Sequence, residues 1–403
     1  MTSICIVAQS FYDFDARVRR KAEALVAAGY TVDVLALRYP GRQARYALNG
    51  VNVHTLALGK KRGSLPRYLV EYAAFFFWVF LQVPLLMRRR RYSVVDVNTL
   101  PDFLIFAPVI ARWMGATLVL DMHEITPEFY MSKYGLSERS WIVRLLTFLE
   151  RISFNFADHV TTITDPIQDL FVSRGLSRRK STVIMNVADE ARFVGAGNRP
   201  PAPGAADGRK FVMMYHGTLT AIYGLQIAVE AFDTAKSEMP GAELWILGVG
   251  SEEGALAELV EQRGLTGQIK MVGQIPAGEI PGWLTKCDAG VLPMRRDVFL
   301  DFCFPNKLAE YIVMGKPVIL SRLRGLPHYF SEEAVAYFEP DDARDLARQM
   351  VRLHRDRELC ARIAARAAEE YAPIRWDVMK QRYLRLIESL TQPARLAERA
   401  QAA

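Results

Sequence analysis

Short apolar runs rich in β-branched residues alternate with amphipathic stretches along the first half of the chain. Residues 4–8 form the first run, residues 16–28 have the apolar spacing of a helix, and residues 31–37 form a second run after Gly29. This alternation is typical of a β–α–β unit with parallel strands. We therefore predict a parallel sheet, with further strands at residues 51–56, 94–97, 117–121, 159–163 and 181–184.

The alternation stops between residues 195 and 210, where proline and glycine are too frequent for a regular element. It returns afterwards, with helices at residues 225–237 and 252–262 and strands at residues 211–216, 243–247, 268–272, 289–292, 317–321 and 334–338. Two successive units of this kind predict an α/β protein in which two Rossmann-like domains face each other across a cleft.

The chain is long enough for two complete domains. Its 403 residues are 51% hydrophobic and 24% charged, which suits two buried cores and excludes a disordered chain. We place an N-terminal domain at residues 1–194, a linker at 195–210, a C-terminal domain at 211–374 and a helical tail at 375–403. The composition is helical from residue 343 to residue 390 apart from a break at Pro373. We expect that the tail can return to the N-terminal domain.

Cysteines and net charge indicate the cellular compartment and the kinds of partner to expect. Its four cysteines are widely separated and form no CxxC pair, which predicts neither a disulfide framework nor a zinc site and favours a reducing cytoplasm. The apolar stretch after Met1 has no basic region before it and is short, so we interpret it as a strand rather than a signal peptide. A net charge of +7 suits phosphates, an anionic membrane surface and nucleic acid alike.

Candidate ligand-binding residues follow the predicted strands, because ligands of open parallel sheets bind at the carboxyl ends of strands. Gly217 and Thr218 lie between a strand and a helix, whose first N–H groups could bind phosphate. Gly248 and Gly250 end the next strand and would let a ligand approach the backbone. Glycines also simply turn chains, so either pattern alone is weak.

The segment from Phe304 to Gly315 carries the most chemistry. Pro305 fixes a turn, and Lys307 and Glu310 lie three positions apart on one face of the predicted helix. A lysine can neutralise phosphate oxygens while a carboxylate accepts from ribose hydroxyls, so the pair suits a nucleoside diphosphate. The alternative is a surface ion pair that contributes well under ~1 kcal/mol.

Polar residues also follow strands of the first half. His123, Glu124 and Glu128 come after the strand at 117–121, on the wall of the cleft where an acceptor would bind. No second histidine stands four residues after His123, so we expect no metal site. Arg17 lies one turn into the first helix, just after Asp15, and could bind an anionic acceptor, although most such charges are simply solvated.

In this order, the motifs resemble family 4 of the glycosyltransferases, retaining enzymes of the GT-B fold, and especially bacterial members that build surface polysaccharides. The resemblance spans nearly the whole chain. It rests on Asp15-Ala-Arg17-Val18, Asp121-Met-His123-Glu124, His216-Gly217-Thr218-Leu219, Phe304-Pro305-Asn306-Lys307-Leu308-Ala309-Glu310-Tyr311 and Gly315-Lys316-Pro317-Val318-Ile319.

The resemblance implies transfer of a sugar from a nucleotide diphosphate sugar, UDP before GDP, with no metal or other cofactor. Glu310 would meet the donor ribose and Lys307 the donor phosphates. His123 would hydrogen-bond the sugar, and Glu124 would orient a substrate or its loop. Further donor-side residues would be Gly217, Thr218, Gly248, Gly250, Phe304, Pro305, Asn306 and either Arg295 or Arg296. The acceptor side would include Asp15, Arg17 and Glu128.

The sequence departs from the family pattern at three places. The first glutamate of the family's Glu, seven residues, Glu motif is replaced by Phe302, with Asp301 next to it. Thr218 and Tyr223 stand where the family commonly has an arginine and a lysine. The glycine pair of the first domain is replaced by Ser10-Phe11-Tyr12-Asp13. The donor phosphates must therefore find positive charge elsewhere, and Lys307 is the first candidate.

Residues 68–87 form the most apolar segment, and Arg88 to Arg91 follow it directly. The length just meets the roughly 20 residues that span a bilayer, but a span would put neighbouring strands of one sheet on opposite sides of the membrane. A core helix and an interfacial helix with arginines on lipid headgroups both remain. The interfacial helix predicts a cytoplasmic protein, peripheral on the inner face of the plasma membrane, with an anionic membrane surface and a lipid-linked glycan acceptor as partners.

Other functions are less well supported. A non-hydrolysing nucleotide-sugar epimerase has the same architecture and would isomerise the donor without an acceptor. A non-catalytic sugar-nucleotide-binding partner of a transferase would show no turnover. A Rossmann oxidoreductase is disfavoured because no GxGxxG follows any predicted strand. Only the overall charge favours nucleic acid, and we expect no such partner.

Overall fold

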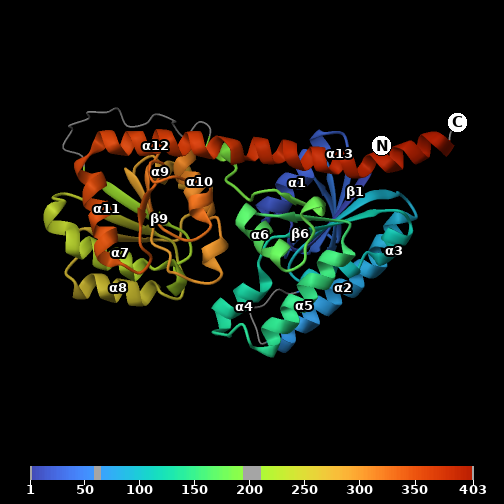
Figure 1. The fold of residues 1–403 in the computed structure, drawn as a ribbon, viewed down its shortest axis with the longest axis horizontal. Helices are drawn as coiled ribbons and strands as arrows, with labels where there is room; N and C mark the ends of the chain where they lie inside the picture. The colour runs from blue at the N-terminus through green and yellow to red at the C-terminus, as the bar shows by residue number, and fades with distance from the viewer. Residues whose placement is uncertain (1, 59–64, 194–209, 402–403) are drawn as a thin grey trace. The chain divides into compact units, whose positions relative to one another are not determined.

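The computed structural model describes residues 2–58, 65–193 and 210–401 and divides into two compact units (Figure 1). The first unit consists of residues 1–185 and 377–403, and the second of residues 186–376. Each unit is built on its own sheet. The linker predicted at residues 195–210 lies outside the described residues except for Lys210.

The first unit contains an eight-stranded sheet in the order β3-β4-β2-β1-β5-β6-β7-β8, parallel except for the edge pair β3–β4. Every predicted strand is present, and β3 is additional. Its residues alternate between exposed and half-buried, so it has no apolar run that a sequence pattern could reveal. The strands are β1 (Ser3–Phe11), β2 (Thr31–Leu37), β3 (Arg45–Leu48), β4 (Val51–Leu56), β5 (Tyr92–Asn98), β6 (Thr117–Met122), β7 (His159–Thr162) and β8 (Ser181–Val183).

Helices connect these strands. The first helix begins where it does because Asp15 accepts hydrogen bonds from the backbone N–H groups of Arg17 and Val18. It stops before Gly29, whose φ of 86° suits glycine. The helices before the linker are α1 (Ala16–Ala27), α2 (Leu65–Met87), α3 (Val109–Trp113), α4 (Thr126–Tyr134), α5 (Trp141–Phe156) and α6 (Asp165–Ser173).

The second unit contains a six-stranded parallel sheet in the order β11-β10-β9-β12-β13-β14. Its strands are β9 (Val212–His216), β10 (Glu243–Leu247), β11 (Ile269–Gly273), β12 (Ala289–Leu292), β13 (Val318–Ser321) and β14 (Ala336–Phe338). Its helices are α7 (Leu225–Ala235), α8 (Glu253–Gln262), α9 (Ile280–Leu284), α10 (Asn306–Val313), α11 (Ala343–Arg355) and α12 (Arg357–Tyr371).

Strand order marks one point in each sheet as the place for a ligand. The chain runs outward from β9 to β10 and then crosses back to β12 on the other side, and β1 lies in the same way between β2 and β5. At such a switch point the connections leave in opposite directions and open a crevice beyond the carboxyl ends of the strands. The loops after β1 and β5 in the first sheet, and after β9 and β12 in the second, therefore lie at these switch points.

The last helix, α13 (Trp376–Gln401), belongs from Asp377 onward to the first unit. A 3-10 turn that contains Pro373 separates it from α12. Its buried Tyr383 donates a hydrogen bond of 2.7 Å to the buried carboxylate of Asp96 on β5. Its Met379 sulfur accepts one of 3.3 Å from the Met185 backbone. The part of α13 that carries Met379 and Tyr383 thus belongs to the core of the first unit.

Replacing Tyr383 by phenylalanine should destabilise the first unit. Burial raises the pKa of Asp96 to about 6, and without the Tyr383 hydroxyl this carboxylate loses a donor that stabilises its charged form. We expect a loss of about 1–3 kcal/mol in the free energy of unfolding, measured by urea titration at neutral pH. Tyr134→Phe, at a half-exposed tyrosine on α4, is the control. Equal stability of the two variants would contradict the structural role of this hydrogen bond.

Candidate functional site

Two loops of the second unit touch each other backbone to backbone beyond β9 and β10. A Cβ atom added to Gly248 would lie 1.8 Å from the Gly217 oxygen, and one added to Gly250 would lie 2.0 Å from the Leu219 oxygen. Gly217 and Gly248 also have φ values of 131° and 141°, which favour glycine. The glycines that the sequence singled out are therefore required by the fold itself, whatever binds beside them.

Lys307, from the first turn of α10, covers this glycine turn. A Cβ atom on Gly217 would lie 2.0 Å from the lysine Cε and 2.7 Å from its Nζ. The ammonium stands 4.4 Å from the ring centre of Tyr223 and 5.3 Å from that of Tyr215. Among the described residues, aromatic faces rather than a carboxylate hold this charge.

Burial lowers the pKa of Lys307 to about 8, although Glu310 opposes the shift. Desolvation disfavours a charged lysine unless an anion compensates it. In the described part of the chain, the Lys307 ammonium lies against tyrosine rings and is in no ion pair, which suits an anionic ligand.

Glu310 and His216 meet beside Lys307. Burial raises the pKa of Glu310, while Arg192 and Lys307 lower it. Burial and the charge of Lys307 lower the pKa of His216 to about 3, so its ring is neutral. Its Nε2 lies 3.5 Å from a Glu310 oxygen but has no hydrogen-bond partner among the described residues. Glu310 and His216 thus offer a carboxylate and an unpaired imidazole nitrogen at the end of β9.

Phe304 and Pro305 shape the approach to α10. The Phe304 ring packs on Tyr329 and Phe330, with ring centres 5.9 Å and 6.1 Å apart. Pro305 precedes the helix with φ of −74° and ψ of 119°, an extended conformation that starts the helix at the exposed Asn306. The packing of Phe304 and the conformation of Pro305 therefore set where α10 begins, and Lys307 lies in its first turn.

The other charged candidates of this segment are paired elsewhere. The buried carboxylate of Asp301 lies 3.5 Å from Arg296 and 3.4 Å from Arg324. Arg295 is exposed and lies 3.5 Å from Asp341. Of the cations that the sequence proposed for the phosphates, Lys307 lies against Gly217, whereas Arg295 and Arg296 lie near carboxylates. The Asp301 carboxylate, next to the missing glutamate position, is thus already near two arginines.

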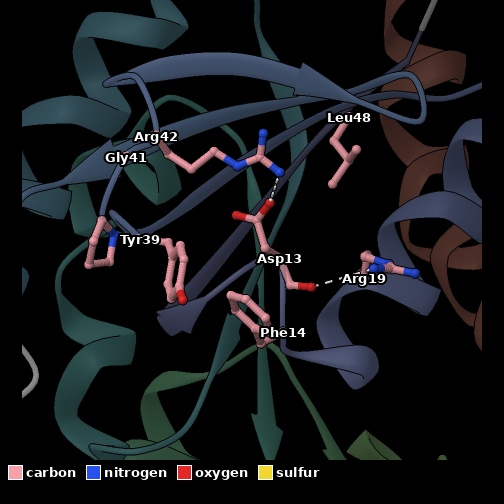
Figure 2. Close-up of a pocket in the computed structure, with 8 residues that line it drawn as sticks. Asp13, Phe14, Arg19, Tyr39, Gly41, Arg42 and Leu48 are labelled. Atoms are coloured by element: carbon pink, nitrogen blue, oxygen red, sulfur yellow. Dashed lines mark hydrogen bonds and ion pairs between the residues drawn. The ribbon is translucent and has the colours of Figure 1, made fainter. Parts of the chain in front are cut away.

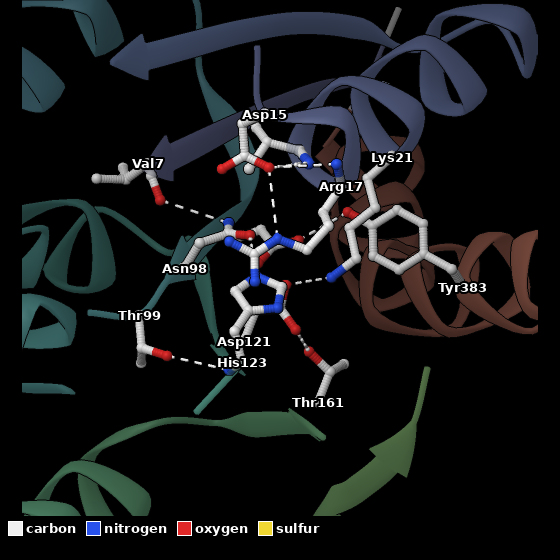
Figure 3. A network of polar contacts seen from close by, with 12 residues as sticks. Val7, Asp15, Arg17, Lys21, Asn98, Thr99, Asp121, His123, Thr161 and Tyr383 are labelled. Atoms are coloured by element: carbon white, nitrogen blue, oxygen red, sulfur yellow. Dashed lines mark hydrogen bonds and ion pairs between the residues drawn. The ribbon is translucent and has the colours of Figure 1, made fainter. Parts of the chain in front are cut away.

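In the first unit, a fully buried carboxylate organises the end of β6 (Figure 3). Asp121 is paired with the ammonium of Lys21 and accepts a 2.6 Å hydrogen bond from Thr161. His123 Nε2 lies 2.9 Å from Oδ2, the other oxygen of the Asp121 carboxylate. Burial would raise the pKa of Asp121, but His123 and Lys21 hold it well below its usual range. Lys21 also stands 5.1 Å over the ring of Tyr383.

This network fixes the tautomer of His123. Its Nε2 lies 2.9 Å from Asn98 Oδ1 as well as from the Asp121 carboxylate. Because both neighbours are acceptors, Nε2 carries the hydrogen. Burial lowers the pKa of the ring despite Asp121, so Nδ1 is a neutral acceptor, and it has no partner among the described residues. A sugar hydroxyl is the kind of donor that it could bind.

Asp15, Arg17 and Glu124 gather around this histidine. Figure 3 shows the Arg17 guanidinium beside the His123 ring, with Asp15 holding it from the other side at 3.5 Å. Although burial opposes it, Arg17 keeps the pKa of Asp15 below its usual value. Burial raises the pKa of Glu124, which Arg17 lowers. The structure thus brings together Asp15, Arg17, His123 and Glu124.

Glu128 stands apart from this group. It is buried on α4 and paired with Arg174, whose guanidinium also lies 3.2 Å from the buried Glu150. Burial raises the pKa of Glu150 to about 8, although Arg174 lowers it. Glu128 therefore pairs with an arginine inside the unit, and its place in the acceptor site stays a prediction.

A hollow of about 510 Å³ opens at the loop that precedes Asp15 (Figure 2). Asp13 accepts hydrogen bonds there from Arg42 and from the Tyr46 hydroxyl. The rings of Phe14 and Tyr39 lie 4.6 Å apart on its wall and are largely exposed. Aromatic faces beside a polar pair suit a ligand with both apolar and hydroxyl-bearing surfaces.

Two family models match this chain one after the other. A glycosyl transferase 4-like domain matches residues 15–186, and a glycosyl transferases group 1 domain matches residues 210–356. The chain belongs to the glycosyltransferases. The motifs quoted for the resemblance lie inside these two matches, and the predicted family is confirmed.

This glycosyltransferase is 29% identical over 234 residues to the colanic acid biosynthesis glycosyltransferase WcaL of Escherichia coli K12, which covers 56% of this chain and 55% of the relative. The chain spans about half the length of the curated relatives it matches. Sucrose-phosphate synthase from Thermosynechococcus elongatus has a TM-score of 0.75 at 20% identity, over 97% of this chain and 99% of that one. HepE from Anabaena, solved with UDP, has a TM-score of 0.69 at 17% identity, over 96% and 100%. These structures confirm the predicted GT-B fold.

Sequence reasoning missed several residues of the glycosyltransferase that hold the candidates in place. Lys21 follows Arg17 by one helical turn and lies among apolar positions of α1, a pattern that signals a buried charge in need of a partner. Tyr215 gave no signal because it lies inside an apolar strand. Arg192, which lowers the pKa of Glu310, is separated from it by more than a hundred residues and had no local signal.

If Lys307 binds a diphosphate, the affinity for such a ligand should fall as pH rises through the pKa of this lysine, and UDP serves as the probe. That pKa is lowered to about 8 by burial, so the ammonium is present below pH 8 and is lost above it. Bound phosphate would raise the pKa of the lysine, and the dissociation constant should therefore increase by up to about tenfold per pH unit above 8. Calorimetric titration on both sides of pH 8 measures this.

Lys307→Arg is the matched control, because a guanidinium stays charged throughout this range. Its UDP affinity should vary little with pH. The same pH dependence in this variant and in the parent would show that another group titrates.

Proposed function

We propose that the chain is a retaining glycosyltransferase that moves a sugar from a nucleotide diphosphate sugar to a lipid-linked glycan in surface polysaccharide synthesis. The observation that carries this proposal is the half-buried Lys307 ammonium against the Gly217 turn, with Glu310 on the same helix face. The name of the relative WcaL, which refers to colanic acid biosynthesis, supports the polysaccharide. UDP comes first among nucleotides because HepE was solved with UDP.

The second unit would hold the nucleotide. Lys307 would bind the diphosphate oxygens, and the backbone around Gly217 would let them come close because no side chain intervenes. Glu310, only 22% exposed, would accept from the ribose hydroxyls. The neutral His216 could donate or accept at its unpaired Nε2. Phe304, Pro305 and Asn306 would act by positioning the first turn of α10.

Lys307 would also carry the chemistry. In a front-side displacement, the acceptor hydroxyl attacks the anomeric carbon from the face that the nucleotide leaves. The bond from that carbon to the diphosphate oxygen breaks, and the departing phosphate takes the hydroxyl proton. Negative charge therefore grows on the diphosphate, where a preorganised ammonium lowers the barrier.

The first unit would serve the sugar and the acceptor. His123 offers a neutral Nδ1 acceptor, which suits a sugar hydroxyl. Arg17 is 33% exposed and held by Asp15, so it could bind an anionic group of the acceptor. Glu124 lies within the field of Arg17 and would orient a substrate or its loop. A lipid-linked acceptor would place this unit at the inner face of the plasma membrane.

Lys307→Ala should abolish most transfer while the fold remains. Loss of a preorganised charge at a developing anion costs about 10²–10³ in kcat, and UDP affinity should fall as well. Transfer is measured as UDP release with a lipid-linked acceptor. Lys270→Ala, at a lysine paired with Glu243 on the sheet edge, is the control. Unchanged donor affinity in Lys307→Ala would refute the assignment of this lysine to the phosphates.

A panel of nucleotide sugars in thermal-shift assays would identify the donor, because a ligand far above its dissociation constant stabilises the folded protein. Proton NMR of the product then reads the configuration at the anomeric carbon. Retention supports the proposed mechanism, and inversion contradicts it. A donor that isomerises without an acceptor would identify an epimerase. Binding without turnover for any donor and acceptor would identify a non-catalytic partner, which the missing first glutamate at Phe302 favours.

A further inference from the structure

The outward face of α2 is apolar along most of its length. One described helix is long and apolar enough to cross a bilayer, the stretch Val70–Met87, yet only 28% of that stretch is buried. Its exposed large residues recur at the spacing of a single helical stripe: Val70, Phe77, Leu81 and Leu85, exposed by 67%, 62%, 60% and 47%. The opposite stripe is buried in the first unit: Phe75, Val79, Val83 and Met87. One face of this helix is therefore part of the core, as the core interpretation predicts. The other face is exposed and apolar, as the interfacial interpretation predicts.

A second helix, which the sequence did not single out, repeats the pattern. On α5, Trp141, Leu145 and Phe148 are 72%, 45% and 59% exposed and lie at the spacing i, i+4, i+7. Arg144 and Arg151 are exposed on the same stripe. Rings and arginines thus alternate along one side of this helix, while its other side is buried.

The helices that carry the two stripes lie along one side of the first unit. Figure 1 shows α2, α3 and α5 along the same side of that unit. The short helix α3 packs beside α2 and ends at Trp113, which is 79% exposed. Its Arg112 donates a 2.6 Å hydrogen bond to the Phe156 carbonyl at the end of α5. We call this surface, formed by the exposed stripes of α2 and α5 with Trp113, the apolar face.

All exposed charge on the helices of the apolar face is positive. The single acid of α2, Glu71, and the single acid of α5, Glu150, are both buried. Arg88 to Arg91 follow α2 and are exposed, and Arg90 alone of these four has an ion pair in the described part of the chain, with Asp33. Exposed aromatic rings bordered by arginines match the chemistry of an anionic bilayer, whose headgroups bind the cations while its acyl chains receive the rings.

We propose that the apolar face docks the protein on a bilayer surface containing anionic lipid, with α2 and α5 lying in the interface. A span by α2 is disfavoured, because it would remove Phe75, Val79 and Val83 from the core of the first unit. The proposal rests on the proposed function for its purpose, which is to reach a lipid-linked acceptor. The docking itself is inferred from the exposed side chains alone, so it can be tested without an assay of sugar transfer.

Flotation of the full chain with vesicles tests the docking. Vesicles of phosphatidylcholine with phosphatidylglycerol should carry the protein, and vesicles of phosphatidylcholine alone should carry much less. The variant Phe77→Glu with Phe148→Glu should reduce the bound fraction at least about tenfold, because it places charge in the acyl region on both helices. Arg88→Glu with Arg144→Glu should abolish the preference for anionic lipid and its sensitivity to salt.

Val298→Glu is the matched control, since Val298 is a 43% exposed apolar residue of the second unit. It should bind vesicles as the parent does. UDP affinity and thermal midpoint should be unchanged in the docking variants, which shows that they fold. Equal flotation of the Phe77 and Phe148 variant and the parent would overturn the proposal. A parent dimer that the same substitutions dissociate, without vesicle binding, would identify a second copy as the occupant instead.

Failure of the docking and failure of the proposed function are distinguishable. Vesicle binding without transfer from any nucleotide sugar would leave the apolar face standing and refute the enzyme. Transfer to a soluble acceptor analogue without vesicle binding would support the enzyme and refute docking by the apolar face.

Discussion

Each unit of this glycosyltransferase holds a charge that burial desolvates near the carboxyl ends of its strands, Asp121 in the first and Lys307 in the second. The groups that compensate each charge decide what the site can do. Lys21, His123 and Thr161 surround Asp121, so the negative charge of this carboxylate is compensated inside the protein. Lys307 is enclosed by rings and a glycine turn, which hold it without neutralising it. The first charge can therefore only organise its neighbours, whereas the second still has an anion to gain.

This difference assigns roles that residue types alone could not. Asp121 orders the first unit by drawing in α1 through Lys21, β7 through Thr161 and, beside Lys21, Tyr383 of α13. As a consequence, His123 is fixed with its hydrogen on Nε2 and its Nδ1 open. A histidine that follows a strand is often only structural. Here, the structural partner occupies one nitrogen and leaves the other for a ligand.

The sequence predicted what periodicity and local spacing determine. Parallel strands have apolar runs long enough to be seen, and Lys307 and Glu310 share a helix face by their spacing. Contacts across large sequence separations gave no signal, such as Tyr383 with Asp96 or Arg192 near Glu310. Periodicity also shows which residues share a face but not whether another element covers it. For this reason the sequence could not choose between core and interface for α2, and it overlooked α5.

The loss of the family's first glutamate at Phe302 is not made up by the neighbouring carboxylate, because that carboxylate is already paired. Its neighbour Asp301 is committed to Arg296 and Arg324, so the segment before α10 contributes no free carboxylate from this position. Polar groups for the transferred sugar must then come from other segments, and among the described residues of the second unit the unpaired nitrogen of His216 is one such group. The residues assigned to the nucleotide all lie in the second unit, whereas the apolar face and Arg17 lie in the first. Under the proposed function, the first unit, which carries the apolar face, would meet a membrane-bound acceptor, and the second unit would hold the donor.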